Sequence, residues 1–400
     1  MKETIITVQE AKAILSAQQF EPMVTQIRLA AAIGSVLADD LYALVDIPAF
    51  DQSSMDGYAF AFDSWKSGTA MKVTGRIAAG SDERIMVKEG EAVRVFTGAP
   101  LPEGADTVVM QERTVYRDGF VTIDQADLRK GDNRRIKGTD IKKDTRALAK
   151  NALVTAASVG FLGALGYAKI PVYATPSVAI VITGNELQKP GLPLVFGQVY
   201  EASSAMLQAC LAEMGIADVT VYFVKDELDE TVKVLNDALR SSDVVLITGG
   251  VSVGDYDFVV KAAEQCGIQQ LFHKVKQRPG KPLYAGRKGA QPVFGLPGNP
   301  SSVLTCFYEY VWPLLRKMKG QPDNLTNLQV PLAETYQKNN QLTHFLKGNY
   351  QDGKATILTA QESYRLSSFA VANCFVILDE IMRVYEKGEI VQIHLLPVYG

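Results

Sequence analysis

The chain has 400 residues, of which 47 % are hydrophobic and 21 % are charged. These fractions are near the average for folded proteins and exclude the disordered and fibrous classes. The formal net charge of −3 gives no basic surface of the kind that binds nucleic acid, and no apolar run is long enough to cross a membrane. At about 150 residues per domain, the length predicts two to four packed units.

The first 41 residues carry two helical patterns. Thr7 to Glu10 have the form of a capping box, and the apolar residues that follow predict a helix up to about Phe20. A second helical pattern runs from Ile27 to Leu37.

Residues 42–143 alternate short β-type runs with clusters of Gly, Pro and Asp, which predicts a β-rich unit. The clearest signal is the Asp118-Gly119 pair between Thr114 and Ile123, because these residue types accept the positive φ angles of a hairpin turn. Small and apolar residues at 154–165 then predict a helix.

Beyond residue 172, apolar runs alternate with helical patterns. The predicted strands are 178–182, 219–224, 244–247, 271–275 and 293–296, and the predicted helices are 203–214, 228–239, 258–266 and 301–318. This alternation predicts a doubly wound, mostly parallel α/β sheet with helices on both faces. Residues 321–400 return to short strands, at 355–358, 375–378 and 390–395, and predict a small β domain.

Cysteine, histidine and the start of the chain exclude several site types. The cysteines lack a CxxC pair and have apolar neighbours, which predicts buried free thiols at Cys210, Cys266, Cys306 and Cys374. No histidine has a partner at metal-ligand spacing, so histidine-centred catalysis has no support. The polar start MKETIITVQEAK lacks the apolar core of a signal peptide and predicts a cytoplasmic protein.

Charged and glycine-rich segments follow the predicted strands. In a doubly wound sheet, ligands bind beyond the carboxyl ends of the strands, so we expect Glu186, Asp226 and Asp257 to share one edge with two glycine-rich loops, 248–257 and 296–302. Close carboxylates repel one another by about 4 kcal/mol per pair at an effective dielectric near 20. We therefore expect Mg²⁺, on a phosphate, to compensate them.

The same edge offers groups that suit an anion. The glycines at 249, 250 and 254 let backbone N–H groups approach closely, and the helix beginning near Ser301 offers its positive end. Arg278 and Lys281 add two cations on a Pro-Gly turn. Both features suit phosphate or molybdate.

Each feature also has an explanation without a ligand. Asp226 could cap the helix near Leu228, and Asp255 or Asp257 could be another cap. Residues 297–300 could form only a tight turn, and Arg278 and Lys281 could be solvated. A P-loop is excluded, because Asp255 stands where lysine would be required. The combination of these features at one sheet edge favours a functional site.

Five motifs resemble, in order and spacing, those of one family. They are SSMDGYA (53–59), TGNEL (183–187), TGGVSVGDYD (248–257), PGKP (279–282) and LPGNPSS (296–302). The family is molybdopterin molybdenumtransferase, or MoeA, which includes the carboxy-terminal domain of gephyrin. The resemblance covers nearly the whole chain.

The resemblance implies an L-shaped subunit with four domains. These would be an α/β molybdopterin-binding domain (1–20 and 172–320), a linking domain (21–41 and 144–171), a β-rich domain (42–143) and a C-terminal β-barrel-like domain (321–400). It also implies a homodimer, with each site between the α/β domain of one chain and the β-rich domain of the other. Asp56 and Asp140 would then enter the acidic crevice of the partner, while Phe50, Met55, Tyr58 and Phe60 anchor the Asp56 loop.

The implied reaction takes adenylylated molybdopterin and molybdate and releases molybdenum cofactor and AMP. Glu186, Asp226 and Asp257 would hold Mg²⁺ against the phosphoanhydride. Arg278 and Lys281 would steady the phosphates or the molybdate. The pocket for the pterin and its phosphate would be shaped by Thr183, Gly249, Gly250, Ser252, Gly254, Pro297, Gly298, Asn299, Pro300 and Ser301.

The chain departs from the family pattern at several positions. Thr139 replaces a glutamate, and Glu201-Ala202-Ser203-Ser204 replaces Asp-Ser-Asn-Ser. In the tail, Leu342, His344 and Lys347 replace Arg, Asp and Arg, and neither leucine nor lysine reproduces the bidentate grip of arginine.

Two alternatives to a molybdenumtransferase stay open. One is the adenylyltransferase that makes the intermediate, which we otherwise expect as the partner that delivers it. The β-rich units at 42–143 and 321–400 argue against that alternative. The other is a pterin-binding or scaffold protein without turnover.

Overall fold

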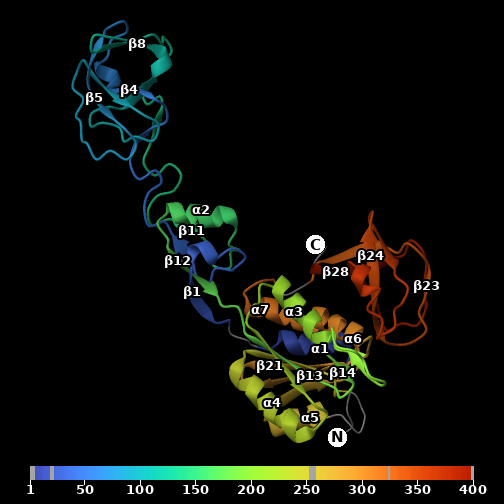
Figure 1. Ribbon diagram of the computed structural model, residues 1–400. Coiled ribbons are helices and arrows are strands. Elements are labelled where there is room, and N and C mark those ends of the chain that lie inside the picture. Colours follow the sequence, from blue (N-terminus) through green and yellow to red (C-terminus); the bar gives the residue numbers. More distant parts are fainter. Residues whose placement is uncertain (1–4, 19–21, 252–257, 323–324, 398–400) are drawn as a thin grey trace. The chain divides into compact units, whose positions relative to one another are not determined.

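The computed structural model describes residues 5–18, 22–251, 258–322 and 325–397. They fall into two compact units, residues 1–25 with 173–400 and residues 26–172, each with hydrophobic cores of its own (Figure 1). The boundaries of four domains within these units stay a prediction. Among the described helices, none combines the length and the apolar composition that a bilayer crossing requires.

A small core in the unit of residues 26–172 joins the two ends of that segment. Its elements are β1 (Val24–Arg28), η1 (Leu29–Ala31), β2 (Leu41–Tyr42), β11 (Arg146–Leu148), α2 (Ala156–Ala164) and β12 (Lys169–Tyr173), with β1 paired to β12 and β2 to β11. The helix predicted for 154–165 is confirmed by α2. The helix predicted for 27–37 was wrong, because Ile27 lies in β1 and Gly34 takes a φ of 77°, which a helix does not accommodate. Leu29 and Leu37 instead pack with Leu162 in one core.

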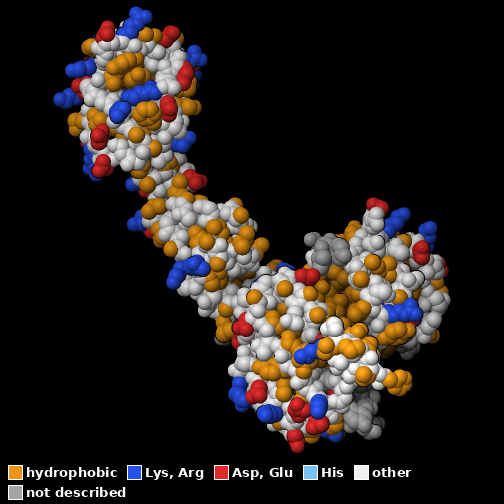
Figure 2. Space-filling view, in the orientation of Figure 1, with side chains coloured by type: hydrophobic (Ala, Val, Ile, Leu, Met, Phe, Trp, Pro, Cys, Tyr) orange, Lys and Arg blue, Asp and Glu red, His pale blue; other side chains and the backbone are white. Residues whose placement is uncertain are grey.

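The rest of this unit is rich in β structure, as predicted. A six-stranded sheet has the order β7 (Thr107–Met110), β4 (Gly57–Phe60), β6 (Glu91–Val95), β5 (Met71–Ile77), β9 (Phe120–Ile123) and β8 (Thr114–Arg117); β3 (Gln52–Ser53) pairs with β10 (Arg134–Arg135), and η2 (Phe62–Ser64) and η3 (Gln111–Arg113) are 3₁₀ turns. The predicted hairpin is confirmed, with φ angles of 50° at Asp118 and 84° at Gly119. Figure 2 shows positive and negative side chains interspersed on the visible face of this part, without a surface of one sign.

The other unit contains the α/β sheet. Its strand order is β16 (Val219–Val224), β13 (Val178–Thr183), β17 (Val244–Thr248), β21 (Gln291–Leu296), β20 (Tyr284–Lys288) and β18 (Gln269–His273). The first four strands are parallel, and β20 runs antiparallel to both of its neighbours. The mostly parallel sheet is therefore confirmed, and the sequence pattern missed β20.

Helices cover both faces of this sheet (Figure 1). One face carries α1 (Val8–Ser16), α3 (Ser203–Glu213), α6 (Pro300–Cys306) and α7 (Trp312–Met318), and the other carries α4 (Leu228–Ser241) and α5 (Phe258–Gln265). Side chains alternate along β13, so Val178, Ile180 and Ile182 enter the first core and Ala179 and Val181 the second. This two-sided burial explains why the strand reads as a continuous apolar run.

The helical run predicted for residues 301–318 is not uniform. A π-helical segment, η4 (Phe307–Val311), separates α6 from α7. Pro313 lacks the N–H that would bond to the carbonyl of Glu309, so the regular helical ladder fails at this point. By contrast, the capping box predicted from Thr7 and Glu10 is confirmed at the start of α1.

The C-terminal β structure shares a strand with the α/β sequence. The sheet has the order β19 (Gln277–Arg278), β24 (Thr343–Gln351), β26 (Cys374–Leu378), β28 (Ile390–Leu395) and β22 (Asn327–Pro331); β25 (Lys354–Ile357) pairs with β24, β23 (Tyr336–Gln337) with β27 (Val384–Tyr385), and η5 (Phe369–Val371) is a 3₁₀ turn. β19 runs parallel to β24, with Arg278 opposite His344. A short parallel pair, β14 (Leu187–Gln188) and β15 (Val199–Tyr200), lies beyond the end of β13.

Candidate functional site

A pocket of about 750 Å³ lies where β13, β17 and β21 end, within the unit of residues 1–25 and 173–400. Such a volume suits a small-molecule ligand. Eleven of the residues predicted for the site line it: Thr183, Glu186, Asp226, Gly249, Gly250, Arg278, Lys281, Pro297, Gly298, Asn299 and Pro300. Ser301 is fully buried and is not among the lining residues, and Ser252, Gly254 and Asp257 lie outside the described residues.

One side of the pocket is acidic. Glu186 is exposed, and Asp226 is half-buried with Oδ2 accepting a hydrogen bond from the Asn185 N–H at 3.3 Å. The capping explanation of Asp226 was wrong, since α4 has Glu227 as its N-cap residue and no side-chain cap hydrogen bond. Neither Glu186 nor Asp226 forms an ion pair within the described part of the chain.

The glycine-rich loop after β17 approaches β13 closely at Gly249. Gly249 has a φ of +85°, and a Cβ added there would lie 2.5 Å from Oγ1 of Thr183. Only glycine meets both conditions, so this residue type is required for the close approach of the two strand ends. Residues 248–251 of the loop are part of the pocket wall.

The pocket lining also carries the two predicted cations. Arg278 and Lys281 are both exposed, on the turn that leaves β19. Neither has an ion pair or a side-chain hydrogen bond among the described residues. Their charges are therefore available to an anion in the pocket.

The C-terminal domain closes a further side of the pocket, which the motifs did not indicate. Leu342 and residues 361–364 line it, and Nδ2 of Asn299 donates a hydrogen bond to Oγ of Ser363 at 3.1 Å. No local signal in the sequence predicts this contact, because the two residues are 64 positions apart.

Two residues that depart from the family pattern, Lys347 and Glu201, form hydrogen bonds within the fold. Lys347 is buried, and its Nζ donates to the carbonyls of Ala360 at 2.8 Å and Arg365 at 3.0 Å and to Oγ of Ser301 at 3.3 Å. Burial lowers the pKa of Lys347 to about 8. Glu201 accepts a hydrogen bond from the Ser204 N–H at 2.8 Å, at the start of α3.

Asp56 and Asp140 belong to the other unit, residues 26–172. Oδ1 of Asp56 accepts two hydrogen bonds of 2.8 Å, from the N–H and from Oγ1 of Thr97. These bonds hold the pKa of Asp56 below its ordinary value. Thr97 was not predicted, since it lies 41 residues away in sequence; Asp140 is exposed, as is Thr139.

The residues around Asp56 divide into a buried and an exposed pair. Tyr58 and Phe60 are buried in the core of their own unit, whereas Phe50 and Met55 are 43 % and 41 % exposed. The Asp56 loop is therefore anchored on one side and open on the other.

A metal ion would find oxygen ligands in the pocket. Among the described residues, no three His, Cys, Asp or Glu side chains lie together closely enough to hold a metal ion. The carboxylates of Glu186 and Asp226 do line one cavity, together with those of Glu201 and Glu362. Mg²⁺ is commonly held by one or two carboxylates together with substrate phosphates and water, so this donor set fits Mg²⁺.

Known proteins match this chain along almost its whole length. Three family models match in succession: the MoeA N-terminal region (domain I and II) at residues 6–166, a probable molybdopterin binding domain at 179–317, and the MoeA C-terminal region (domain IV) at 329–396. Proteins named molybdopterin molybdenumtransferase from Staphylococcus aureus (strain Mu50) and Staphylococcus epidermidis (strain ATCC 12228) are 33 % and 32 % identical to it. Each match covers 98 % of this chain and 96 % of the relative.

The chain belongs to the molybdopterin molybdenumtransferase (MoeA) family. Solved structures agree with this assignment. The MoeA molybdopterin biosynthesis protein from Pyrococcus horikosii matches with a TM-score of 0.86 at 28 % identity, over 98 % of this chain and 99 % of that one. A second structure, from Pyrococcus horikoshii OT3, matches with a TM-score of 0.75 at 29 % identity, over 98 % and 100 % of the two chains.

The MoeA assignment confirms the predicted fold class, an α/β domain with further β-rich domains. It also bears on the first alternative. Because the relatives match outside the α/β domain as well, the adenylyltransferase alternative is not favoured.

Proposed function

We propose that this protein inserts molybdenum from molybdate into adenylylated molybdopterin and releases molybdenum cofactor and AMP. The observation that supports this proposal best is the composition of the pocket, which places Glu186 and Asp226 together with Arg278 and Lys281. A substrate that carries phosphates and takes up a metal oxyanion needs groups of both signs. The names of the curated relatives point to the same reaction.

Arg278 and Lys281 bind the anionic groups in this proposal. Molybdate carries two negative charges, and so does a phosphate ester, so carboxylates alone would repel them. The two cations offset that repulsion. Backbone groups at Gly249 and Gly250 and the segment 297–302 shape the space for the pterin and its phosphate.

Glu186, Asp226 and Asp257 would hold Mg²⁺. When bound, the ion would supply charge to the phosphoanhydride oxygens and make AMP a better leaving group. The carboxylates keep this charge beside the phosphates, and Arg278 and Lys281 orient the anions toward it.

The proposal includes a homodimer in which Asp56 and Asp140 of the partner subunit complete each site. Two features of the Asp56 loop support this part of the proposal. Hydrogen bonds from Thr97 lower the pKa of Asp56 and so favour its ionised form, and the side chains of Phe50 and Met55 leave apolar surface exposed. We place the protein in the cytoplasm, since all four cysteines are free and buried, as predicted.

The test is the release of AMP by the purified protein from adenylylated molybdopterin, with and without molybdate. We expect release that depends on molybdate, and a loss of about 10²–10³ in rate for Asp226→Asn. Asp237→Asn is the matched control, an aspartate on the exposed face of α4 outside the pocket. Binding of the pterin without AMP release would instead identify a scaffold protein.

A further inference from the structure

The turn from Gln277 to Pro282 carries both cations of the pocket. It begins in β19, where Gln277 and Arg278 pair with Thr343 and His344 of β24. Lys281 and Arg278 have no ion-pair partner among the described residues, so no carboxylate of the described chain fixes them. Their position must come from the backbone of the turn.

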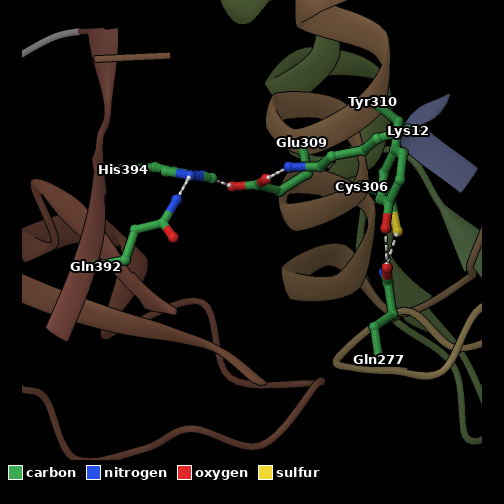
Figure 3. A network of polar contacts seen from close by, with 7 residues as sticks. All are labelled: Lys12, Gln277, Cys306, Glu309, Tyr310, Gln392 and His394. Atoms are coloured by element: carbon green, nitrogen blue, oxygen red, sulfur yellow. Dashed lines mark hydrogen bonds and ion pairs between the residues drawn. The ribbon is translucent and has the colours of Figure 1, made fainter. Parts of the chain in front are cut away.

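The side chain of Gln277 holds that backbone from inside. It is 1 % exposed, and its Nε2 donates to the carbonyls of Pro279 at 3.1 Å and Gly280 at 3.2 Å. Its Oε1 accepts a hydrogen bond from the hydroxyl of Tyr310, and Nε2 also contacts Sγ of Cys306 at 3.5 Å (Figure 3). A primary amide has two N–H donors and one carbonyl acceptor, and all of them are used here.

The packing around Gly280 leaves no room for a side chain. Gly280 has a φ of +82°, and a Cβ there would lie 2.5 Å from Sγ of Cys306 and 3.0 Å from Nε2 of Gln277. Tyr310 is also buried, in η4, and burial keeps its pKa well above its ordinary value, so the hydroxyl stays a donor at neutral pH. The turn therefore rests on a rigid base made of one amide, one thiol and one phenol.

We propose that Gln277 is a positioning residue for the reaction: it fixes the carbonyls between Arg278 and Lys281, so that both cations meet an anion in the pocket, and Tyr310 orients its amide. This inference rests on the proposed function. Glutamate would place acceptors against two carbonyl oxygens, and methionine would leave them without donors, so the amide is required. The PGKP motif alone does not indicate the role of Gln277.

Gln277→Met tests the inference, with Tyr310→Phe as a milder variant that removes only the hydroxyl. We expect Gln277→Met to weaken the binding of inorganic molybdate and of AMP by about tenfold or more, since displacements near 1 Å can cost up to about a hundredfold. Tyr310→Phe should weaken it in the same direction by a smaller factor. Titration calorimetry measures both affinities without turnover.

Gln291→Met is the matched control. The amide of Gln291 also donates to two carbonyls, those of Leu239 and Ser242, but it lies outside the pocket. We expect this variant to lose thermal stability comparably and to keep the affinities for molybdate and AMP. Equal losses of affinity in both methionine variants would overturn the inference.

A double-mutant cycle with Lys281→Ala separates positioning from general stability. If Gln277 acts through Lys281, the two losses in affinity for molybdate will not multiply, because the second change removes a cation that is already misplaced. Losses that multiply, or unchanged affinity in Gln277→Met, contradict the inference. Failure of the wild-type protein to bind either anion would instead count against the proposed function.

Discussion

Two loops of this protein carry charge toward a proposed site, and they are held in different ways. The turn with Arg278 and Lys281 is fixed through its backbone carbonyls by buried Gln277. The loop with Asp56 is fixed through the carboxylate itself, by two hydrogen bonds from Thr97. Long cationic side chains keep many rotamers, so only their base can be positioned, whereas the short aspartate can be held at the atom that carries the charge.

The largest expected effect tests whether the Asp56 loop serves the pocket of the partner subunit. Asp56→Asn and Asp226→Asn should each lower the rate by about 10²–10³. If the proposed homodimer forms, mixing the two inactive variants and letting them exchange subunits gives heterodimers with one intact site, so about a quarter of the sites should recover. Activity that stays at the level of the single variants after verified exchange would show that Asp56 does not act across the dimer.

A third charged group, Glu309, lies in the helical segment η4 and not in a loop. It is 2 % exposed, with ion pairs to Lys12 and His394 (Figure 3). Burial raises its pKa, but the two partners outweigh burial and lower it from 4.5 to about 2. The stabilisation is therefore fully present above pH 4.5 and is lost as the pH falls toward 2.

The lowered pKa of Glu309 corresponds to about 2 to 3 kcal/mol of folding stability, once the partial exposure of Lys12 is allowed for. We expect Glu309→Gln to remove this dependence and to lower the free energy of unfolding at neutral pH by a similar amount. Urea unfolding across the acidic range measures both. If the free energy of unfolding of the variant depends on pH as steeply as that of the wild type, Glu309 is not the source of the pH dependence. Glu362→Gln, which changes an exposed carboxylate, is the control.

Thr97→Val should have a smaller effect, of about tenfold on kcat/KM, because it removes one of the two bonds to Asp56. The remaining bond lowers the pKa of Asp56 less, so that pKa rises. The acid limb of the pH-rate profile should then move to higher pH. Thr97→Ser keeps the hydroxyl and should keep the profile, and a shift in both variants would show that another group sets the limb.

The smallest effect is expected where the C-terminal domain contacts the pocket. Ser363→Ala removes the acceptor of Asn299 at an exposed site, so KM should rise only about two- to fivefold with kcat unchanged. Steady-state kinetics with the adenylylated pterin measures this. A fall in kcat instead would give Ser363 a part in the chemical step.

Local signals explain which parts of the fold the sequence predicts. The run Val178–Ile182, the Asp118-Gly119 turn and the Thr7 cap each depend on neighbours within a few residues. The helix expected at 27–37 failed because its apolar residues face a core completed by α2, more than a hundred residues later. Hydrophobic periodicity alone does not distinguish a helix from an irregular segment that packs against distant residues.

Within the candidate site, too, local signals are predictable from the sequence and contacts between distant residues are not. Glu186, Asp226, Arg278 and Lys281 follow strand ends or sit in a motif, so sheet topology was enough to group them. Gln277 meets Tyr310 across 33 positions, and Thr97 meets Asp56 across 41. The residues that hold the charged groups are thus harder to predict than the charged groups.

Glu309 joins the first helix and the last strand of the chain to one carboxylate. Residues 173–400 form an unbroken stretch of sequence, yet among its described residues the carboxylate keeps His394 alone, because Lys12 comes from α1. Excising that stretch would leave the buried carboxylate without its lysine partner. We therefore expect a fragment of residues 173–400 to be less stable than one that also contains α1.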